Sequence, residues 1–222
     1  MAYTTINKST DYFNTKLYTG TGSTNAITGV GFQPDMVWSK NRSTTFNHQI
    51  NDAVRGVNKQ IAPNLTNAQE TNTGELTAFG SDGFTVGSGG TLNGSGNNIC
   101  SWNWLANGQG SANSDGDITS TVSANTTSGF SIVKYTGNGS TNQTVGHGLG
   151  LVPKLIINKQ LTTQNWFVYH HSIGNTDALK LNTTDAKTTS SAWNNTTPTS
   201  SVFTIGTSSS TNVSGEDFIN YC

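Results

Sequence analysis

The chain has 222 residues, with 11 lysines and arginines against 12 aspartates and glutamates, so its net charge is −1. A protein that binds nucleic acid through charge needs a clearly basic face, and this balance excludes that class. Threonine (36), serine (24), asparagine (27) and glycine (25) supply 112 residues, whereas only 10% of residues are charged. Because these types favour strands and turns over helices, the composition excludes an all-α protein.

Targeting segments, membrane spans and cysteines indicate the compartment in which a protein is made and acts. No basic-then-apolar leader precedes residue 12, so we expect no secretory signal, and no apolar run is long enough to span a bilayer. Two cysteines are too few for a disulfide scaffold, and Cys100 lies in an apolar run that predicts a small core residue. We therefore expect a protein made in the cytoplasm, released by lysis, and not inserted in a membrane.

Short apolar runs separated by clusters of turn residues predict strands along the whole chain. The expected strands are 13–18, 36–38, 83–87, 99–104, 130–135, 155–157, 166–170, 201–206 and 219–222. A short helix is weakly indicated at 67–73. Phe84 and Phe203, each in a short run of β-branched residues that ends in glycine, are expected to be buried anchors of the core.

The chain repeats itself. Tyr-Thr-Gly-x-Gly-Ser-Thr-Asn occurs at 18–25 and 135–142, an offset of 117, and residues 34–40 match 153–159 at an offset of 119. The second offset also relates 83–87 to 202–206. We therefore predict two units, 1–106 with a short N-terminal arm and 118–222, joined by a Gly/Ser/Asn/Asp-rich linker at 107–117. The predicted fold is all-β, with two tandem similar β-sandwich units of jelly-roll-like form.

The sequence lacks the common motifs of catalytic sites. Neither a Gly-x-Ser-x-Gly elbow nor a phosphate-binding loop occurs, and Gly20-x-Gly22-x-x-Asn25 lacks the third glycine of a dinucleotide fingerprint. Glycosidases need two facing carboxylates, but Glu216 and Asp217 stand where the first unit has two asparagines, as solvated turn positions would. The other candidate carboxylates are Glu70, Glu75 and Asp82. We expect no enzyme and no cofactor.

Metal binding is not predicted either. Asn113-x-Asp115-x-Asp117 has the first spacings of a calcium loop, but Ile118 and Ala124 replace its turn glycine and its bidentate glutamate. His170 and His171 are adjacent on an expected strand, so their side chains should leave on opposite faces. His48 and His147 have no partnering motif.

Aromatic side chains could form a recognition surface, because tryptophan faces stack on sugar rings. The candidates are Trp166, His170, His171 and Trp193, all in the second unit. The alternative is that Trp166 belongs to the core and Trp193 anchors a loop.

Several strings of this sequence resemble a repeat unit of structural proteins from phages that infect marine bacteria. They include YTGTGSTNAITGVGFQPDMVWSK, and GHGLG-x-x-P-K-x-I-I-x-K at 146–159 is the most specific. The resemblance implies a non-enzymatic virion protein and transfers no catalytic residue. It also implies a homo-oligomer, a trimer by analogy, and contacts with other virion proteins and a host surface glycan. Relatives often continue past the position of Cys222.

Three functions remain open from the sequence. The first is a tail-fibre or appendage subunit exposed on the particle. The second is a capsid decoration protein or head fibre, and the third is a cellular carbohydrate-binding module. Within the virion interpretation, loops at 160–201 are richer in aromatics than those at 41–82. We therefore expect the second unit to face outward and the first to face the virion or a neighbouring subunit.

Overall fold

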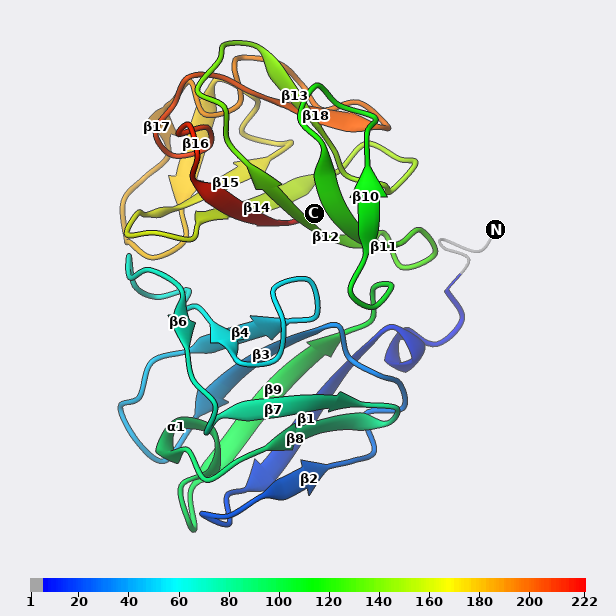
Figure 1. Ribbon diagram of the computed structural model, residues 1–222, viewed down its shortest axis with the longest axis vertical. Coiled ribbons are helices and arrows are strands. Elements are labelled where there is room, and N and C mark those ends of the chain that lie inside the picture. Colours follow the sequence, from blue (N-terminus) through cyan, green and yellow to red (C-terminus); the bar gives the residue numbers. More distant parts are fainter. Residues whose placement is uncertain (1–5) are drawn as a thin grey trace. The chain divides into compact units, whose positions relative to one another are not determined.

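The computed structural model describes residues 6–222 and confirms an all-β sandwich fold (Figure 1). The chain divides into two compact units. The first comprises the described residues up to Ala62 together with Gln69–Gln109, and the second comprises Pro63–Ala68 together with Gly110–Cys222. Residues 1–5 of the expected N-terminal arm lie outside the described range. In residues 6–222, no helix has the length and apolar character needed to cross a membrane.

The first unit packs two antiparallel sheets against each other, and in Figure 1 strands β7, β8 and β2 lie across β1 and β9. The larger sheet has the order β1 (Phe13–Thr19), β9 (Asn98–Trp104), β3 (Met36–Asn41) and β4 (Gln49–Asp52). The smaller has the order β2 (Asn25–Ile27), β8 (Gly83–Val86) and β7 (Leu76–Gly80). The remaining elements are η1 (Ser9–Asp11), the hairpin β5 (Lys59–Gln60) and β6 (Glu70–Thr71), and α1 (Gly90–Asn93).

The second unit contains one long sheet and one short one. The long sheet has the order β10 (Ser111–Asn113), β11 (Ser120–Asn125), β12 (Phe130–Thr136), β19 (Asp217–Tyr221), β14 (Leu155–Gln160), β15 (Trp166–His170), β16 (Asp177–Lys180) and β17 (Thr188–Thr189). The short sheet pairs β13 (Gln143–Gly146) with β18 (Val202–Ile205). Since β1, β9, β3 and β4 correspond to β12, β19, β14 and β15, the central strand order is the same in both units.

Each unit has its own hydrophobic core. In the first, Val37 and Phe84 pack with Leu76, and in the second Tyr135 and Phe203 pack with neighbouring buried side chains. Phe84 is 2% exposed and Phe203 is fully buried, as predicted from the sequence. Burying an aromatic ring of this size removes a large apolar area from water, so these residues anchor their cores.

Equivalent close contacts occur at the same turn in each of the two units. The hydroxyl of Tyr18 donates to the carbonyl of Leu92 at 2.9 Å, and that of Tyr135 donates to the carbonyl of Thr211 at 2.6 Å. A Cβ atom at Gly20 would lie 2.3 Å from the carbonyl oxygen of Gly94, so only glycine allows this approach. Gly137 stands in the same relation to Val213, at 2.4 Å.

Three expectations need correction or extension. Residues Ser111–Asn113, within the predicted linker, form β10 and pair with β11 because their backbone groups find partners there. The helix indicated at 67–73 is wrong, since Glu70–Thr71 form strand β6 and the helical turn lies at α1. Strands β4, β7, β11 and β16 lie in segments where no strand was predicted.

Candidate functional site

The two tryptophans proposed for recognition are buried, so that part of the prediction is wrong. Trp166 is fully buried, and its indole nitrogen donates to the carbonyl of Leu65 at 3.1 Å. Trp193 is 1% exposed and packs in the core, with its ring centroid 5.9 Å from that of Tyr169. Neither ring offers a face to a ligand.

The two histidines of the prediction lie at the surface. Strand β15 ends at His170, so His171 starts a turn and the two ring centroids come within 4.9 Å of each other. The expected divergence of adjacent strand residues is therefore wrong at this position. His171 is exposed and donates its backbone N–H to the carbonyl of Lys154 at 2.9 Å. Among residues 6–222, no group of three or more His, Cys, Asp or Glu side chains is placed to hold a metal.

Exposed apolar side chains lie on residues 151–155, the segment whose end bonds to these histidines. Leu151 is 71% exposed, Val152 37% and Leu155 42%, and Leu155 pairs directly with His170 across β14 and β15. Single exposed leucines are common, but several beside each other indicate a contact surface. We refer to Leu151, Val152, Leu155, His170 and His171 as the histidine patch.

The larger accumulation of aromatic rings lies on the first unit, where the sequence analysis did not place a site. Strands β1, β3 and β9, with the residue just before β4, bring five rings onto the outer face of the sheet. We call it the aromatic face, and its members are Phe13, Trp38, His48, Trp102 and Trp104. All five are half-buried.

Alternation along the strands is the reverse of the usual pattern. Ser39, Ser101 and Asn103 are almost fully buried toward the second sheet, whereas Trp38 and Trp102 point outward between them. Antiparallel sheets with one solvated face ordinarily place apolar residues inside and polar residues outside. Large rings retained on the outer face therefore indicate a surface made for contact.

The rings of the aromatic face hold one another. The Trp38 indole donates to Nδ1 of His48 at 3.0 Å, and the Trp38 and Trp102 centroids are 6.4 Å apart. The His48 ring stacks on Trp102 at 6.4 Å, while Phe13 and Trp104 are 4.8 Å apart. Burial, followed by the charge of Lys40, lowers the pKa of His48, so its ring is neutral and Nδ1 can accept.

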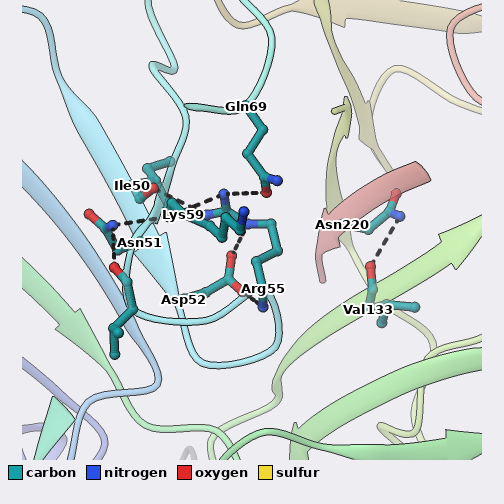
Figure 2. A network of polar contacts seen from close by, with 9 residues as sticks. Ile50, Asn51, Asp52, Arg55, Lys59, Gln69, Val133 and Asn220 are labelled. Carbon is teal, nitrogen blue, oxygen red and sulfur yellow. Dashed lines mark hydrogen bonds and ion pairs between the residues drawn. The ribbon is translucent and has the colours of Figure 1, made fainter. Parts of the chain in front are cut away.

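A buried ion pair fixes the loop between β4 and β6 (Figure 2). Arg55 donates from Nε to Asp52 at 2.6 Å, from one terminal nitrogen to the carbonyl of Ile50 at 3.1 Å, and from the other to Gln69 at 3.3 Å. Both charged side chains are at most 1% exposed. Because Nε and both terminal nitrogens of Arg55 each have a hydrogen-bond acceptor, the ion pair holds the base of the β5–β6 hairpin in place. Figure 2 also draws Asn220 of the second unit, which donates to the carbonyl of Val133 at 3.4 Å.

Each unit also contains a lysine enclosed by backbone carbonyls. Nζ of Lys40 donates to the carbonyls of Asn41 and Phe46 at 2.7 and 2.6 Å. Nζ of Lys159 donates to those of Gln160 and Thr162 at 2.7 and 2.8 Å. Lys159 is fully buried, and this burial lowers its pKa to about 8. In both units the ammonium group thus orders the loop that follows the third central strand.

Segment Pro63–Ala68, the tip of the β5–β6 hairpin, belongs to the second unit and completes its lysine site. We call this segment the first hook. The carbonyl of Thr66 accepts from the amide of Gln164 at 2.9 Å and from Nζ of Lys159 at 3.4 Å, while the Leu65 carbonyl accepts from Trp166. The first hook therefore binds through its backbone. Because its Leu65 carbonyl bonds the indole nitrogen of Trp166, the first hook also helps to cover this ring.

A comparison with protein families identifies the chain. Residues 8–222 match the model of a domain of unknown function, DUF7483. The chain belongs to this family. Neither a curated protein nor a solved structure matches it.

The chain thus presents two surfaces, the aromatic face and the histidine patch, and a lysine site that the first hook fills. Of the two surfaces, the sequence analysis had proposed only His170 and His171. The aromatic face could have been found by noting that Cys100, Trp102 and Trp104 share one side of the strand predicted at 99–104, opposite Ser101 and Asn103. What the sequence could not supply was the pairing of Trp102 with Trp38 across β9 and β3.

Proposed function

We propose that this chain is a non-enzymatic structural protein of a phage virion, a tail-fibre or appendage subunit exposed on the particle. The observation that carries the proposal is the duplicated framework. The central strand order, the tyrosine-to-carbonyl bonds and the glycine contacts occur twice, whereas the segments outside them differ. Repetition of a rigid unit adds length and surface, which is what an appendage requires. The resemblance to phage repeat units supports the same proposal.

Within this role we propose that the second unit contacts the host through the histidine patch. The patch combines exposed apolar side chains with two imidazoles that can bond sugar hydroxyls. It replaces the buried Trp166 and Trp193 as the recognition surface. The first unit would then face a neighbouring subunit.

Electron microscopy of virions labelled with an antibody to this chain tests the location. Label on the tail or its appendages supports the proposal, and label on neither tail nor capsid overturns it. A copy number in the hundreds, with label on the capsid, would instead assign a decoration protein. Glycan binding by a protein absent from virions would favour a carbohydrate-binding module.

Adsorption to host cells tests the histidine patch. Virions carrying Leu151→Ser with His171→Ala should adsorb about tenfold more weakly, equivalent to roughly 1.4 kcal/mol. Thr126→Ala is the control, because Thr126 is exposed on the β11–β12 turn of the same unit and lies outside the patch. Equal adsorption by both variants would remove the patch from host contact.

A further inference from the structure

The second unit contains a counterpart of the first hook. In the β5–β6 hairpin, Gln60 pairs with Glu70, and in the β16–β17 hairpin Ala178 pairs with Thr188. Both pairs differ by 118 positions, so the loops 61–69 and 179–187 have equal length. Residues 181–186 therefore occupy the position of Pro63–Ala68, and we call them the second hook.

The two hooks are also alike in sequence. Residues 64–68 are Asn-Leu-Thr-Asn-Ala and residues 182–186 are Asn-Thr-Thr-Asp-Ala. Three of the five positions are identical, and Asn67 is matched by the isosteric Asp185. Since the first hook binds through main-chain carbonyls, the second can present the same acceptors from Thr183 and Thr184.

Exposure distinguishes the hooks. In the first, Pro63 is buried and both Leu65 and Thr66 are half-buried. In the second, Leu181 is 37% exposed, and Thr183 and Thr184 are exposed as well. The first hook is thus largely covered by the rest of the protein, whereas the second hook is exposed to solvent.

The first unit contains the counterpart of the site that holds the first hook. Lys40 matches Lys159, and continuing the β3–β4 register places His48 opposite Lys40, where the second unit has Trp166 opposite Lys159. Phe46 contributes the last carbonyl around Lys40, as Gln164 does around Lys159.

This counterpart is open where the occupied site is closed. Lys159 and Trp166 are fully buried and Gln164 is half-buried, whereas Lys40 and His48 are half-buried and Phe46 is 44% exposed. The amide of Gln164 binds the first hook, and the corresponding amide of Phe46 makes no hydrogen bond within residues 6–222.

We propose that the second hook of one copy of this chain docks on the first unit of another copy, at Lys40, Phe46 and the aromatic face. The second unit's own site already holds the first hook, so the second hook finds its matching surface on another copy. Donor and acceptor surfaces differ, and each copy has one of each, so the contact is head-to-tail and builds rings or fibres. The inference deepens the proposed structural role by naming the chain itself as partner.

Disulfide capture between two single-cysteine variants tests this contact. Phe46→Cys and Thr184→Cys are prepared separately, mixed and mildly oxidised, then analysed by non-reducing electrophoresis and mass spectrometry. Docking brings the new thiols together, so the mixed dimer should form about tenfold or more above a Phe46→Cys and Thr126→Cys mixture. Thr126 is exposed on the β11–β12 turn and serves as the matched control.

Two further samples make the result decisive. Thr66→Cys with Gln164→Cys in one chain should close an intramolecular disulfide, because their main chains are bonded at 2.9 Å. The unaltered protein gives the background from Cys100, which is buried, and Cys222, which is half-buried. Equal yields in the two mixtures, or a Phe46→Cys/Thr184→Cys chain that closes on itself as a monomer, would overturn the proposal. Because purified protein is used, such a result would leave the virion location untouched.

Discussion

At the scale of single residues, polar groups inside and aromatic groups outside define this fold. Asn41, Ser101 and Asn103 are fully buried beside half-exposed tryptophans. Buried amides are tolerated only where they find partners, as Asn41 does at the carbonyl of Thr91, 3.0 Å away. The interior is therefore specified by hydrogen bonds as well as by packing, and each core contains at least one large buried ring, Phe84 in the first unit and Phe203 in the second.

Those rings lead to a first prediction. Phe84→Ala and Phe203→Ala should each destabilise their own unit by about 3–5 kcal/mol, because each leaves a cavity in a closed core. Phe46→Ala is the control, since its ring is 44% exposed and should change stability by less than about 0.5 kcal/mol. Denaturant unfolding with hydrogen exchange measures each unit. A loss at Phe46 equal to that at Phe84 would contradict this account.

His147 predicts how stability depends on pH. It is fully buried, and its Nδ1 accepts from the amide of Leu149 at 3.2 Å while Nε2 faces the carbonyl of Thr199. Burial lowers its pKa below 6.5. As the pH falls through 6.5, the His147 imidazole therefore binds a proton in the unfolded chain before it does so in the folded chain. The free energy of unfolding of the second unit consequently falls as the pH falls.

The same residue offers the control. Glutamine can donate to Thr199 and accept from Leu149 without titrating, so His147→Gln should flatten this part of the pH dependence between pH 7 and 5. The comparison is made by urea unfolding across that interval. Parallel curves for the two proteins would show that His147 does not cause the loss.

At the scale of elements, the sequence predicted the strands with apolar alternation and missed those without it. Strand β4 is Gln-Ile-Asn-Asp, yet all four residues are buried, and its polar side chains bond one another and the loop that follows the strand. Asn51, for example, donates to the carbonyls of Val57 and Lys59 at 3.0 Å. Only the fold brings such partners together.

The residues proposed for the recognition surface also depend on contacts that only the fold creates. Trp166 was a candidate for the recognition surface, with a place in the core as the alternative, and the first hook, from a distant part of the chain, bonds its indole. His170 and His171 were expected to leave one strand on opposite faces, but β15 ends at His170 and His171 is exposed in the turn that follows. Contacts between residues 101 positions apart leave no local signal in the sequence.

Asn93 and Asn212 carry the next prediction, since the side chain of each bonds at least three main-chain groups from two separate segments. Asn93 donates to the carbonyls of Ser23 and Gly87 and accepts from the amide of Thr21, and Asn212 makes the corresponding three bonds. Replacing either by alanine leaves those groups unpaired and should destabilise its unit by about 3 kcal/mol.

Thermal unfolding and hydrogen exchange near 20–25 and 137–142 measure the effect. Asn98→Ala is the matched control for Asn93→Ala, because Asn98 is exposed at the start of β9 in the same unit. If Asn93→Ala and Asn98→Ala were equally stable, the turn would not depend on its asparagine.

At the scale of the whole molecule, scarcity of charge is the dominant property. Only 10% of residues are charged, and surface ion pairs such as Lys8–Asp11 and Lys180–Asp185 each contain a side chain that is more than half exposed. Such pairs contribute roughly 0–1 kcal/mol and are screened by salt. The buried Asp52–Arg55 pair is shielded from ions by its surroundings. Stability therefore resides in hydrogen bonds and apolar burial.

This property predicts that stability is nearly independent of ionic strength. Raising sodium chloride from about 0.05 to 0.6 M shortens the screening length from roughly 14 to 4 Å, enough to remove any surface pair. The melting temperature should nevertheless move by less than about 3 °C, because a change of 1 kcal/mol moves it by about 2–4 °C in a protein of this size. Scanning calorimetry at both concentrations measures it, with Asp52→Asn as a destabilised reference. A fall of 8 °C or so in the unaltered protein would show that surface charge carries a share of stability that its geometry does not provide.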